Sequence, residues 1–487
     1  RKGEEYIMEQ MESQEEETER RPSKLRRKGI QHFAAWSATL SAACAGAVDG
    51  WTASGIPYLE QPYNLTDNIT MRGINYDEGS WIGSLSPLGS LIGAIPAGYL
   101  ADFMGRRNLL LLMSIPMFIG WVLILVAHRS IPMLYSARFL QGFTCGVITV
   151  ASPLYSEEIA EVKIRGALGV YLDLNFNLGI FYVYLLGALL PYLSMSLFCT
   201  VLPVLFVVTF FWMPESPMYL LSKGKEKKAE RALCRLRGTP NRRTADIVNE
   251  LKEMQSYINN TDVNASQERG IKGIFVSMAT FKAMTVIFGL MIFRQISGMN
   301  AILAYTVEIF QVAGSSVDPH LSTAIVGFIQ LVATFFPCFV VDRAGRRILL
   351  ILSAGGMAIC LFAMVGRFYL LRKGIELEFM GWMPLVAVNV YIIACSIGLG
   401  PLPWFMMPEL LSNEAKSWVS SIAVCLNWAL AFVVTKFFPV MINELGSELT
   451  YFTFFLICIA GTLFVIFLVP ETRGKSREQI QRELAGL

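Results

Sequence analysis

The chain has 487 residues, of which 54% are hydrophobic and 16% are charged, and its mean hydropathy is +0.48. Soluble domains carry about 25% charged residues, so this composition excludes an ordinary soluble protein and indicates a polytopic protein of the lipid bilayer. The net charge of +3 is too small to predict a nucleic-acid partner.

The sequence contains few residues and motifs that are typical of enzymes or of metal and cofactor sites. Nine cysteines occur without a CxxC pair, and the three histidines lie far apart in the sequence. The sequence contains no phosphate-binding loop, dinucleotide fingerprint, zinc-protease motif or GxSxG motif. We therefore expect no metal site, no cofactor and no enzymatic activity.

In chain order, residues 1–31 are polar and end in a basic cluster, which predicts a disordered cytosolic tail. Residues 32–213 contain six apolar stretches, at 33–57, 80–101, 108–127, 132–154, 168–191 and 194–213. Residues 214–280 are charged and helical in composition, which predicts a cytosolic linker. Residues 281–469 contain six more apolar stretches, at 284–310, 320–341, 348–370, 383–407, 418–442 and 450–469. Residues 470–487 form a second tail.

Each apolar stretch has close to the roughly 20 residues that a bilayer requires. The predicted fold is therefore an all-α membrane protein with twelve transmembrane helices in two six-helix bundles. Lys and Arg residues fall in alternate loops, which places the linker and both termini in the cytosol. The first outer loop holds two glycosylation sequons, at Asn64 and Asn68. We expect a multi-pass protein of the cell membrane.

Charged motifs recur in both halves in the same order. Asp102-Phe-Met-Gly-Arg-Arg returns as Asp342-Arg-Ala-Gly-Arg-Arg, and Pro214-Glu-Ser returns as Pro470-Glu-Thr. This repetition predicts two parallel repeats with a binding site between them. Acid and base residues at cytosolic helix ends can pair, which predicts a latch built from Asp102, Arg106, Arg107, Glu158, Arg165, Glu215, Asp342, Arg346, Arg347, Glu409, Lys416 and Glu471.

The stretch from Met291 to Tyr305 places polar side chains in an apolar helix. Arg294, Gln295 and Asn300 stand at bilayer depth, where a charged group costs about 2.5–3.5 kcal/mol on insertion scales. Such groups normally face a partner or a water-filled cavity. We therefore expect this helix to line a polar cavity.

Taken together, these motifs resemble the sugar porters of the major facilitator superfamily, the group of facilitative glucose transporters. The matching stretches include DFMGRR (102–107), ARFLQG (137–142), PESPMYL (214–220), QISGMNA (295–301), DRAGRR (342–347), GPLPWFMMPEL (400–410) and PETRG (470–474). The likeness to the insect facilitated trehalose transporters in particular rests on three segments, SIGLGPLPW (396–404), NWALAFVVTKFFP (427–439) and PETRGKSREQIQREL (470–484). The resemblance adds Arg138, in ARFLQG, to the cytosolic latch.

The resemblance implies a sugar site made of side chains from several helices. The matching positions are Gln295, Asn300, Gln330, Trp404 and Asn427. Amides both donate and accept hydrogen bonds and so can read sugar hydroxyls, while an indole can stack on a pyranose ring. Tyr305 matches an aromatic of the outer gate. The alternative for single Gln or Trp residues is packing between helices or anchoring at the membrane surface.

Three charged residues depart from the family pattern. Arg294 and Asp173 stand where the family typically has glutamines, and Asp49 lies one turn before Thr52, the position at which proton-coupled members carry an acid. We hypothesise that Arg294 and Asp173 form a salt bridge across the central cavity, with Asp49 as the competing partner. Asp49 is also a possible proton site.

The implied function is facilitative transport of a small neutral sugar, trehalose or a hexose such as glucose, by alternating access. One chain contains the whole pathway, so a monomer is expected to be functional. The alternatives are a proton-coupled sugar symporter, a carrier of a charged or non-sugar solute, and a transporter-like nutrient sensor.

Overall fold

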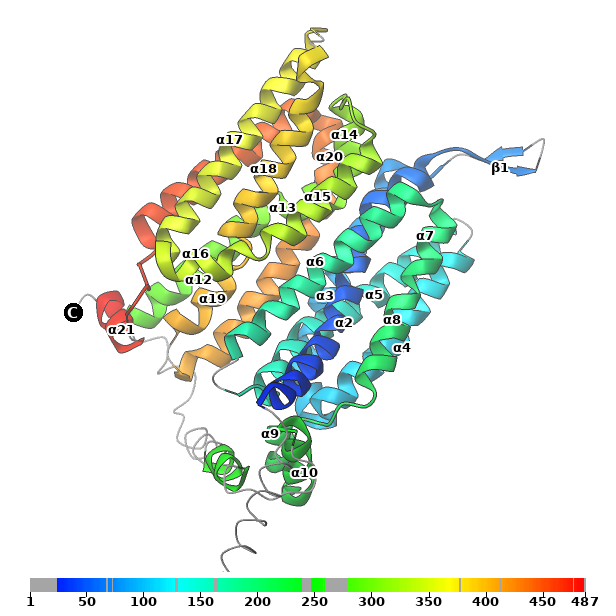
Figure 1. The fold of residues 1–487 in the computed structure, drawn as a ribbon. Helices are drawn as coiled ribbons and strands as arrows, with labels where there is room; N and C mark the ends of the chain where they lie inside the picture. Colours follow the sequence, from blue (N-terminus) through cyan, green and yellow to red (C-terminus); the bar gives the residue numbers. More distant parts are fainter. Residues whose placement is uncertain are drawn as a thin grey trace, which may run out of the picture.

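A computed structural model describes residues 24–66, 69–71, 73–127, 130–161, 165–238, 247–256, 258, 278–375, 378–411, 413–475 and 477–485. In these residues the chain forms two helical bundles that lie side by side (Figure 1). The bundles are called below the N-terminal and the C-terminal half.

The N-terminal half contains six spans. They are α2 (Lys24–Glu60), α3 (Tyr76–Met104), α4 (Arg106–Val126), α5 (Ile131–Ile159), α6 (Arg165–Leu189), and α7 (Tyr192–Cys199) followed by α8 (Val201–Phe210). Between α2 and α3, the strands β1 (Tyr63–Thr66) and β2 (Ile69–Met71) pair antiparallel, with Tyr63 opposite Met71. Helices α3 and α5 approach closely, because a Cβ on Gly93 would lie 2.1 Å from the Phe143 carbonyl oxygen.

The C-terminal half also contains six spans, and several of them are interrupted. They are α12 (Met278–Ile296) with α13 (Met299–Ala304), α15 (Pro319–Ala333) with α16 (Phe336–Ala344), α17 (Arg346–Arg372), α18 (Met383–Ile397) with α19 (Leu402–Leu410), and two spans within α20 (Asn413–Leu468). The two spans of α20 meet at Gly446, whose φ of 83° is non-helical. The short helices α14 (Thr306–Val312) and η2 (Glu378–Trp382) complete this half.

The two ends of the molecule differ. One end carries the linker helices α9 (Pro217–Ser222) and α10 (Glu226–Leu236) and a helix at 247–256, and is called the linker end (Figure 1). The opposite end carries β1 and β2 and is called the hairpin end. Arg237 joins the linker to the N-terminal half, because its guanidinium donates to the Ile159 carbonyl oxygen at 3.0 Å.

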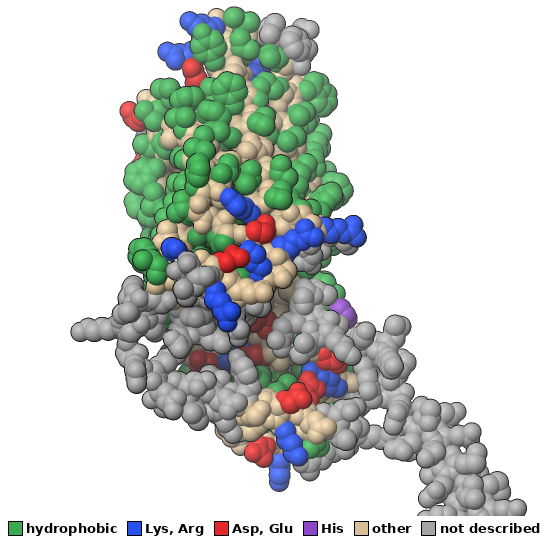
Figure 2. Space-filling view, turned by 90° about the vertical axis from the view of Figure 1, so that its left-hand side faces the viewer, with side chains coloured by type: hydrophobic (Ala, Val, Ile, Leu, Met, Phe, Trp, Pro, Cys, Tyr) green, Lys and Arg blue, Asp and Glu red, His purple; other side chains and the backbone are tan. Residues whose placement is uncertain are grey.

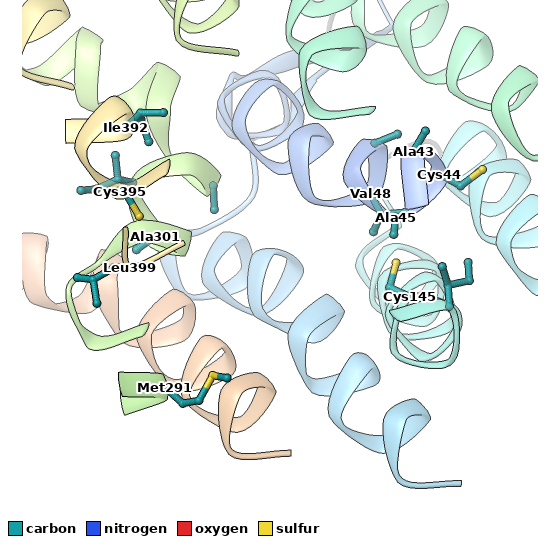
Figure 3. Packing of buried hydrophobic residues seen from close by; sticks show 14 of the residues in the cluster. Ala43, Cys44, Ala45, Val48, Cys145, Met291, Ala301, Ile392, Cys395 and Leu399 are labelled. Carbon is teal, nitrogen blue, oxygen red and sulfur yellow. The ribbon is translucent and has the colours of Figure 1, made fainter. Parts of the chain in front are cut away.

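The outer surface of the helices is apolar. Side chains such as Phe467, Tyr99 and Ile359 are more than 70% exposed. Figure 2 shows a broad hydrophobic band with charged side chains gathered towards its ends. A continuous surface of this kind indicates contact with lipid. Figure 3 shows that small residues and cysteines, among them Ala43, Cys44, Cys145 and Cys395, are buried between the helices.

The predicted twelve spans are confirmed, with differences at their borders. Composition and length alone identify seven membrane-crossing stretches among the described residues. One of these stretches contains both spans of α20, and the four spans that do not meet the criterion are α2, α3, α5 and α15 with α16. Helices α3 and α5 contain several Gly and Ser residues, which lower their hydropathy and allow close packing. Helix α2 begins at Lys24, inside the predicted tail, and the C-terminal tail contains α21 (Arg477–Ala485), which buries Ile480 and Leu484.

Candidate functional site

Side chains of the C-terminal half form a connected amide network. The amide of Asn300 donates to Gln295 Oε1 at 2.9 Å, and Gln295 Nε2 donates to Asn427 Oδ1 at 2.6 Å. Arg294 Nη1 donates to the same Asn427 Oδ1 at 2.8 Å. Gln295 and Asn427 are buried, whereas Asn300 and Arg294 are half-buried. The structure thus brings four of the predicted residues together.

Two helix interruptions position this network. Helix α12, which contains Gln295, ends at Ile296, and α13 begins at Met299 after Gly298, whose φ of 92° favours glycine. The span of α18 and α19 is interrupted between Gly398 and Pro401. Interruptions leave backbone carbonyls without helical partners, and in a membrane these must be satisfied by neighbours.

At each interruption, a free backbone carbonyl accepts a hydrogen bond from a side chain of the other interrupted span. Arg294 Nε donates to the Gly400 carbonyl oxygen at 3.2 Å, and the hydroxyl of Tyr391 donates to the Ser297 carbonyl oxygen at 3.1 Å. The Arg294 guanidinium also lies 5.7 Å from the ring centroid of Trp404, within cation–π range. Arg294 therefore connects the amide network, the indole and the interruption before α19.

The hypothesis of a direct salt bridge between Arg294 and Asp173 is wrong for this conformation. The hydrogen bonds of Arg294 go to Asn427 and Gly400, and Asp173 makes no hydrogen bond or ion pair with any described residue. Asp49, the competing partner, does not pair with Arg294 either. A guanidinium has five donors and can be held by uncharged acceptors, which explains how Arg294 is accommodated without an acid.

Asp173 lies on the face of α6 that turns towards the C-terminal half. Asn177, four residues further along the same face, accepts from Gln330 Nε2 at 2.8 Å and donates to Thr334 Oγ1 at 2.8 Å. Asp173 itself is exposed, and a Cβ added to Gly169, four residues earlier, would have nothing within 4 Å. Contact between the halves is thus lost along this face towards the linker end.

Gln330 reaches its polar partner in the other half and lies apart from the four-residue network. Asn177 is a residue that sequence reasoning missed. The signal was present, because it stands one turn after Asp173 in an apolar segment. Its partner could not be known, because Gln330 is 153 residues away in the chain.

The hairpin end holds a second group that sequence reasoning missed. Lys436 Nζ lies 2.7 Å from Asp77 Oδ1 and donates to Ser80 Oγ at 2.7 Å, and it stands 4.3 Å from the ring centroid of Trp81. Lys436 belongs to α20 and the other three residues to α3, so these contacts join the two halves. A lysine inside an apolar run was the signal in the sequence.

Two further contacts close the hairpin end. The hydroxyl of Tyr76 donates to Glu308 Oε1 at 2.8 Å, which joins α3 to α14. Tyr305, the predicted outer-gate residue, donates to the Thr435 carbonyl oxygen at 3.2 Å and stacks on Phe438, and its hydroxyl approaches Gly83 of the other half. Burial, with a contribution from Glu308, raises the pKa of Glu60 at the end of α2 to about 7.

The latch residues form the same arrangement in each half. Arg106 pairs with Glu158 and with Asp102, each at 3.0 Å, and Arg346 pairs with Glu409 at 3.2 Å.

The carboxylates of the recurring Pro-Glu motifs occupy matching places. Glu215 accepts from the backbone N–H of Arg107 at 3.0 Å, and Glu471 accepts from those of Arg346 and Arg347 at 2.9 and 3.1 Å. Each carboxylate therefore caps a helix N-terminus, where the dipole favours negative charge. All these contacts stay within one half.

Arg138 does not belong to this latch. It is fully buried in the hairpin-side part of α5, and it donates to the carbonyl oxygens of Ile82 and Val48 and to Thr52 Oγ1. An arginine with several neutral acceptors can be buried without an ion pair. The sequence could not reveal this, because the motif ARFLQG does not state the depth of its arginine in the bundle. Asp49 is half-buried near Arg138 and forms no ion pair with it.

Five predicted residues fall, wholly or by their side chains, outside what the structure describes. Asn68 lies outside the described residues, and the side chains of Asn64, Arg165, Asp342 and Lys416 are likewise not described.

Comparison with known proteins identifies a family that the chain matches. A family model described as "Sugar (and other) transporter" matches residues 38–484. The chain is 36% identical, over 456 residues and 94% of its length, to proteins named facilitated trehalose transporter Tret1 from Drosophila yakuba and from Aedes aegypti. It spans about half the length of these curated relatives, 52% and 55% respectively.

A solved structure shares the fold. The xylose transporter XylE from E. coli, in an inward open conformation, matches with a TM-score of 0.74 and 23% identity, over 94% of this chain and 99% of that chain. This likeness confirms the predicted major facilitator fold.

Proposed function

Because the chain belongs to the Sugar (and other) transporter family, we propose that it carries a small neutral sugar across a membrane by facilitated uniport. Trehalose and a hexose such as glucose are the candidate substrates, since the curated relatives are named trehalose transporters. The amide network of Gln295, Asn300 and Asn427 carries this proposal, because amides read hydroxyl groups and Trp404 can stack on a sugar ring.

The proposed mechanism is alternating access between the halves. In the described residues, polar contacts join the halves from the hairpin end to the level of Asn177. Towards the linker end, the ion pairs of the latch stay within each half. This pattern supports a conformation that is closed at the hairpin end, and the reverse conformation requires the hairpin-end contacts to break.

The proposed orientation places the linker end and both chain ends in the cytosol of a cell-membrane protein. Lys and Arg residues in the loops at the linker end support this orientation. Glycans on Asn64 and Asn68, and function as a monomer, remain part of the proposal.

Uniport is favoured over proton symport by the surroundings of Arg138. Its Nη2 donates at 2.8 Å to the hydroxyl of Thr52, a group that does not titrate in the physiological range. Asp49, one turn away, is the acid that a symport mechanism would use, and a proton:xylose symporter shares the fold. Both mechanisms predict sugar uptake, and only symport predicts that a pH gradient drives it.

Uptake of radiolabelled trehalose and glucose in oocytes tests the proposal, with and without an inward pH gradient. We expect uptake of at least one of the two sugars that follows its own gradient and is unchanged by pH. Asn427→Ala should abolish the uptake, whereas Asn389→Ala should preserve it, because among the described residues the Asn389 side chain bonds to Leu385 of its own helix and to no residue of the amide network. No uptake of either sugar, despite surface expression, would reject the sugar-carrier proposal.

A further inference from the structure

Arg294 and Asp173 carry opposite charges and interact electrostatically, but they form no ion pair in this structure. Their charges attract each other, yet Arg294 is held by Asn427 and Gly400, and the exposed Asp173 has no partner among the described residues. The two residues belong to different halves, α12 and α6. The two halves would therefore have to approach each other at this level for Arg294 and Asp173 to form an ion pair.

The geometry of α6 shows where such an approach would occur. Asn177 touches the C-terminal half through two hydrogen bonds of 2.8 Å, whereas Asp173 and Gly169, on the same face, are exposed. The halves thus meet at Asn177 and diverge towards the linker end. A rotation about the Asn177 contact that closes the linker end carries Asp173 towards the C-terminal half.

Arg294 also restricts Asn427 in the present conformation. A carbonyl oxygen has two lone pairs, and Asn427 Oδ1 already accepts from Gln295 at 2.6 Å and from Arg294 at 2.8 Å. A sugar hydroxyl cannot donate to this oxygen while both bonds are present. Movement of Arg294 towards an acid would free one acceptor position.

We propose that Arg294 exchanges partners during the transport cycle: it binds Asn427 and Gly400 when the hairpin end is closed, and Asp173 when the linker end is closed. The exchange makes Arg294 and Asp173 positioning residues of the cycle. The Arg294–Asp173 pair stabilises the conformation closed at the linker end, and it opens the Asn427 acceptor to sugar in that conformation. The Lys436–Asp77 pair is its counterpart in the conformation closed at the hairpin end.

The inference rests on the proposed function only for the existence of two conformations, and its test needs no sugar. Hydrogen exchange of the full chain in nanodiscs would compare residues 76–81 at the hairpin end with residues 402–410 at the linker end. Exchange at each end reports how often that end opens. We expect Asp173→Asn to lower the ratio of hairpin-end to linker-end exchange about fivefold, in the usual range of conformational coupling.

Three controls make the result specific. Asp173→Glu keeps the charge and should leave the ratio close to that of the unmodified chain. Glu157→Gln removes an exposed acid from α5 in the same half and should also leave it unchanged. In an Arg294→Gln background, Asp173→Asn should have no further effect, because the pair is already lost.

The proposal is overturned if Asp173→Asn leaves the ratio unchanged, or lowers it equally in the Arg294→Gln background. An equal effect of Glu157→Gln would also overturn it, because the cause would then be general charge. A failed sugar-uptake assay with a positive exchange result would reject the substrate and keep the ion-pair exchange. The opposite outcome would keep the sugar carrier and reject the exchange.

Discussion

The hairpin end and the linker end contain similar kinds of residues that are connected in different ways. At the hairpin end, charged and aromatic side chains bond across the two halves, as in Lys436 with Asp77 and Tyr76 with Glu308. At the linker end, the described ion pairs connect helices of the same half, as in Arg106 with Glu158. Ion pairs at one end therefore hold a conformation, whereas those at the other end hold the bundles themselves.

A wedge at the hairpin end should have the strongest effect. A Cβ on Gly83 would lie 2.8 Å from the hydroxyl of Tyr305 in the other half, so Gly83→Phe should prevent this end from closing. Overpacking typically costs about 1–3 kcal/mol, and a phenyl ring at this contact should reduce the closed conformation by roughly a hundredfold. Sugar uptake should be lost and exchange of residues 76–81 should rise. Gly98→Phe is the matched control, because nothing would lie within 4 Å of a Cβ added there.

The latch of the linker end should affect stability instead of conformation. Glu158→Gln removes the less exposed of the two acid partners of Arg106, and hydrogen bonds to charged groups contribute about 1.5–3 kcal/mol. Thermal unfolding in detergent should show a lower midpoint, with the exchange ratio of the two ends unchanged. Glu409→Gln should have a smaller effect, because the side chain of Glu409 is 31% exposed and that of Glu158 16%. A large change in the exchange ratio would show that the latch acts between the halves.

Removal of Lys436 at the hairpin end should affect conformation instead of stability. Lys436→Met deletes two polar contacts and the cation–π contact with Trp81, all of which cross between the halves. The hairpin end should open about fivefold more often, seen as faster exchange at residues 76–81, while the unfolding midpoint changes little. Arg372→Gln is the control, because the exposed Arg372 pairs with Glu448 within the C-terminal half. Equal effects of the two variants would remove the distinction between the ends.

The weakest of these effects concerns pH. Burial raises the pKa of Glu60 to about 7, above its ordinary value of 4.5, and Glu308, which belongs to the other half, contributes to this rise. The closed conformation therefore binds this proton more tightly. Its extra stability is complete below pH 4.5 and is lost as the pH rises through about 7.

Glu60→Gln imitates the protonated acid and should favour closure at about pH 8 by roughly threefold, with little effect at about pH 5. Comparing exchange in the variant and the unmodified chain at each pH removes the intrinsic pH dependence of exchange. Glu444→Gln, an exposed acid at the hairpin end, should show no such difference. An effect of Glu60→Gln that is the same at both pH values would contradict this assignment.

Much of the polar site was predictable because its residue types are exceptional in their surroundings. Gln295, Asn300 and Asn427 stand in apolar helices, and the structure joins them in one network. The assignment of Arg138 to the cytosolic latch was wrong, because a sequence motif does not show how deep its arginine lies in the bundle. Asn177, Lys436 and Tyr76 were missed as contacts between the halves, because their partners are 153 to 359 residues away in the chain.

The number of spans, the two repeats and the polar character of the stretch around Arg294 can all be read from the sequence. These follow from local properties, since about 20 apolar residues cross a bilayer wherever they occur in the chain. The partner of Arg294, in contrast, depends on the tertiary structure. The opposite charges of Arg294 and Asp173, both unusual for the family, suggested a salt bridge. In the structure, however, Arg294 donates to the carbonyl oxygen of Gly400 and to the amide oxygen of Asn427. The choice among acceptors depends on how the halves are rotated, which is a property of the packed bundles.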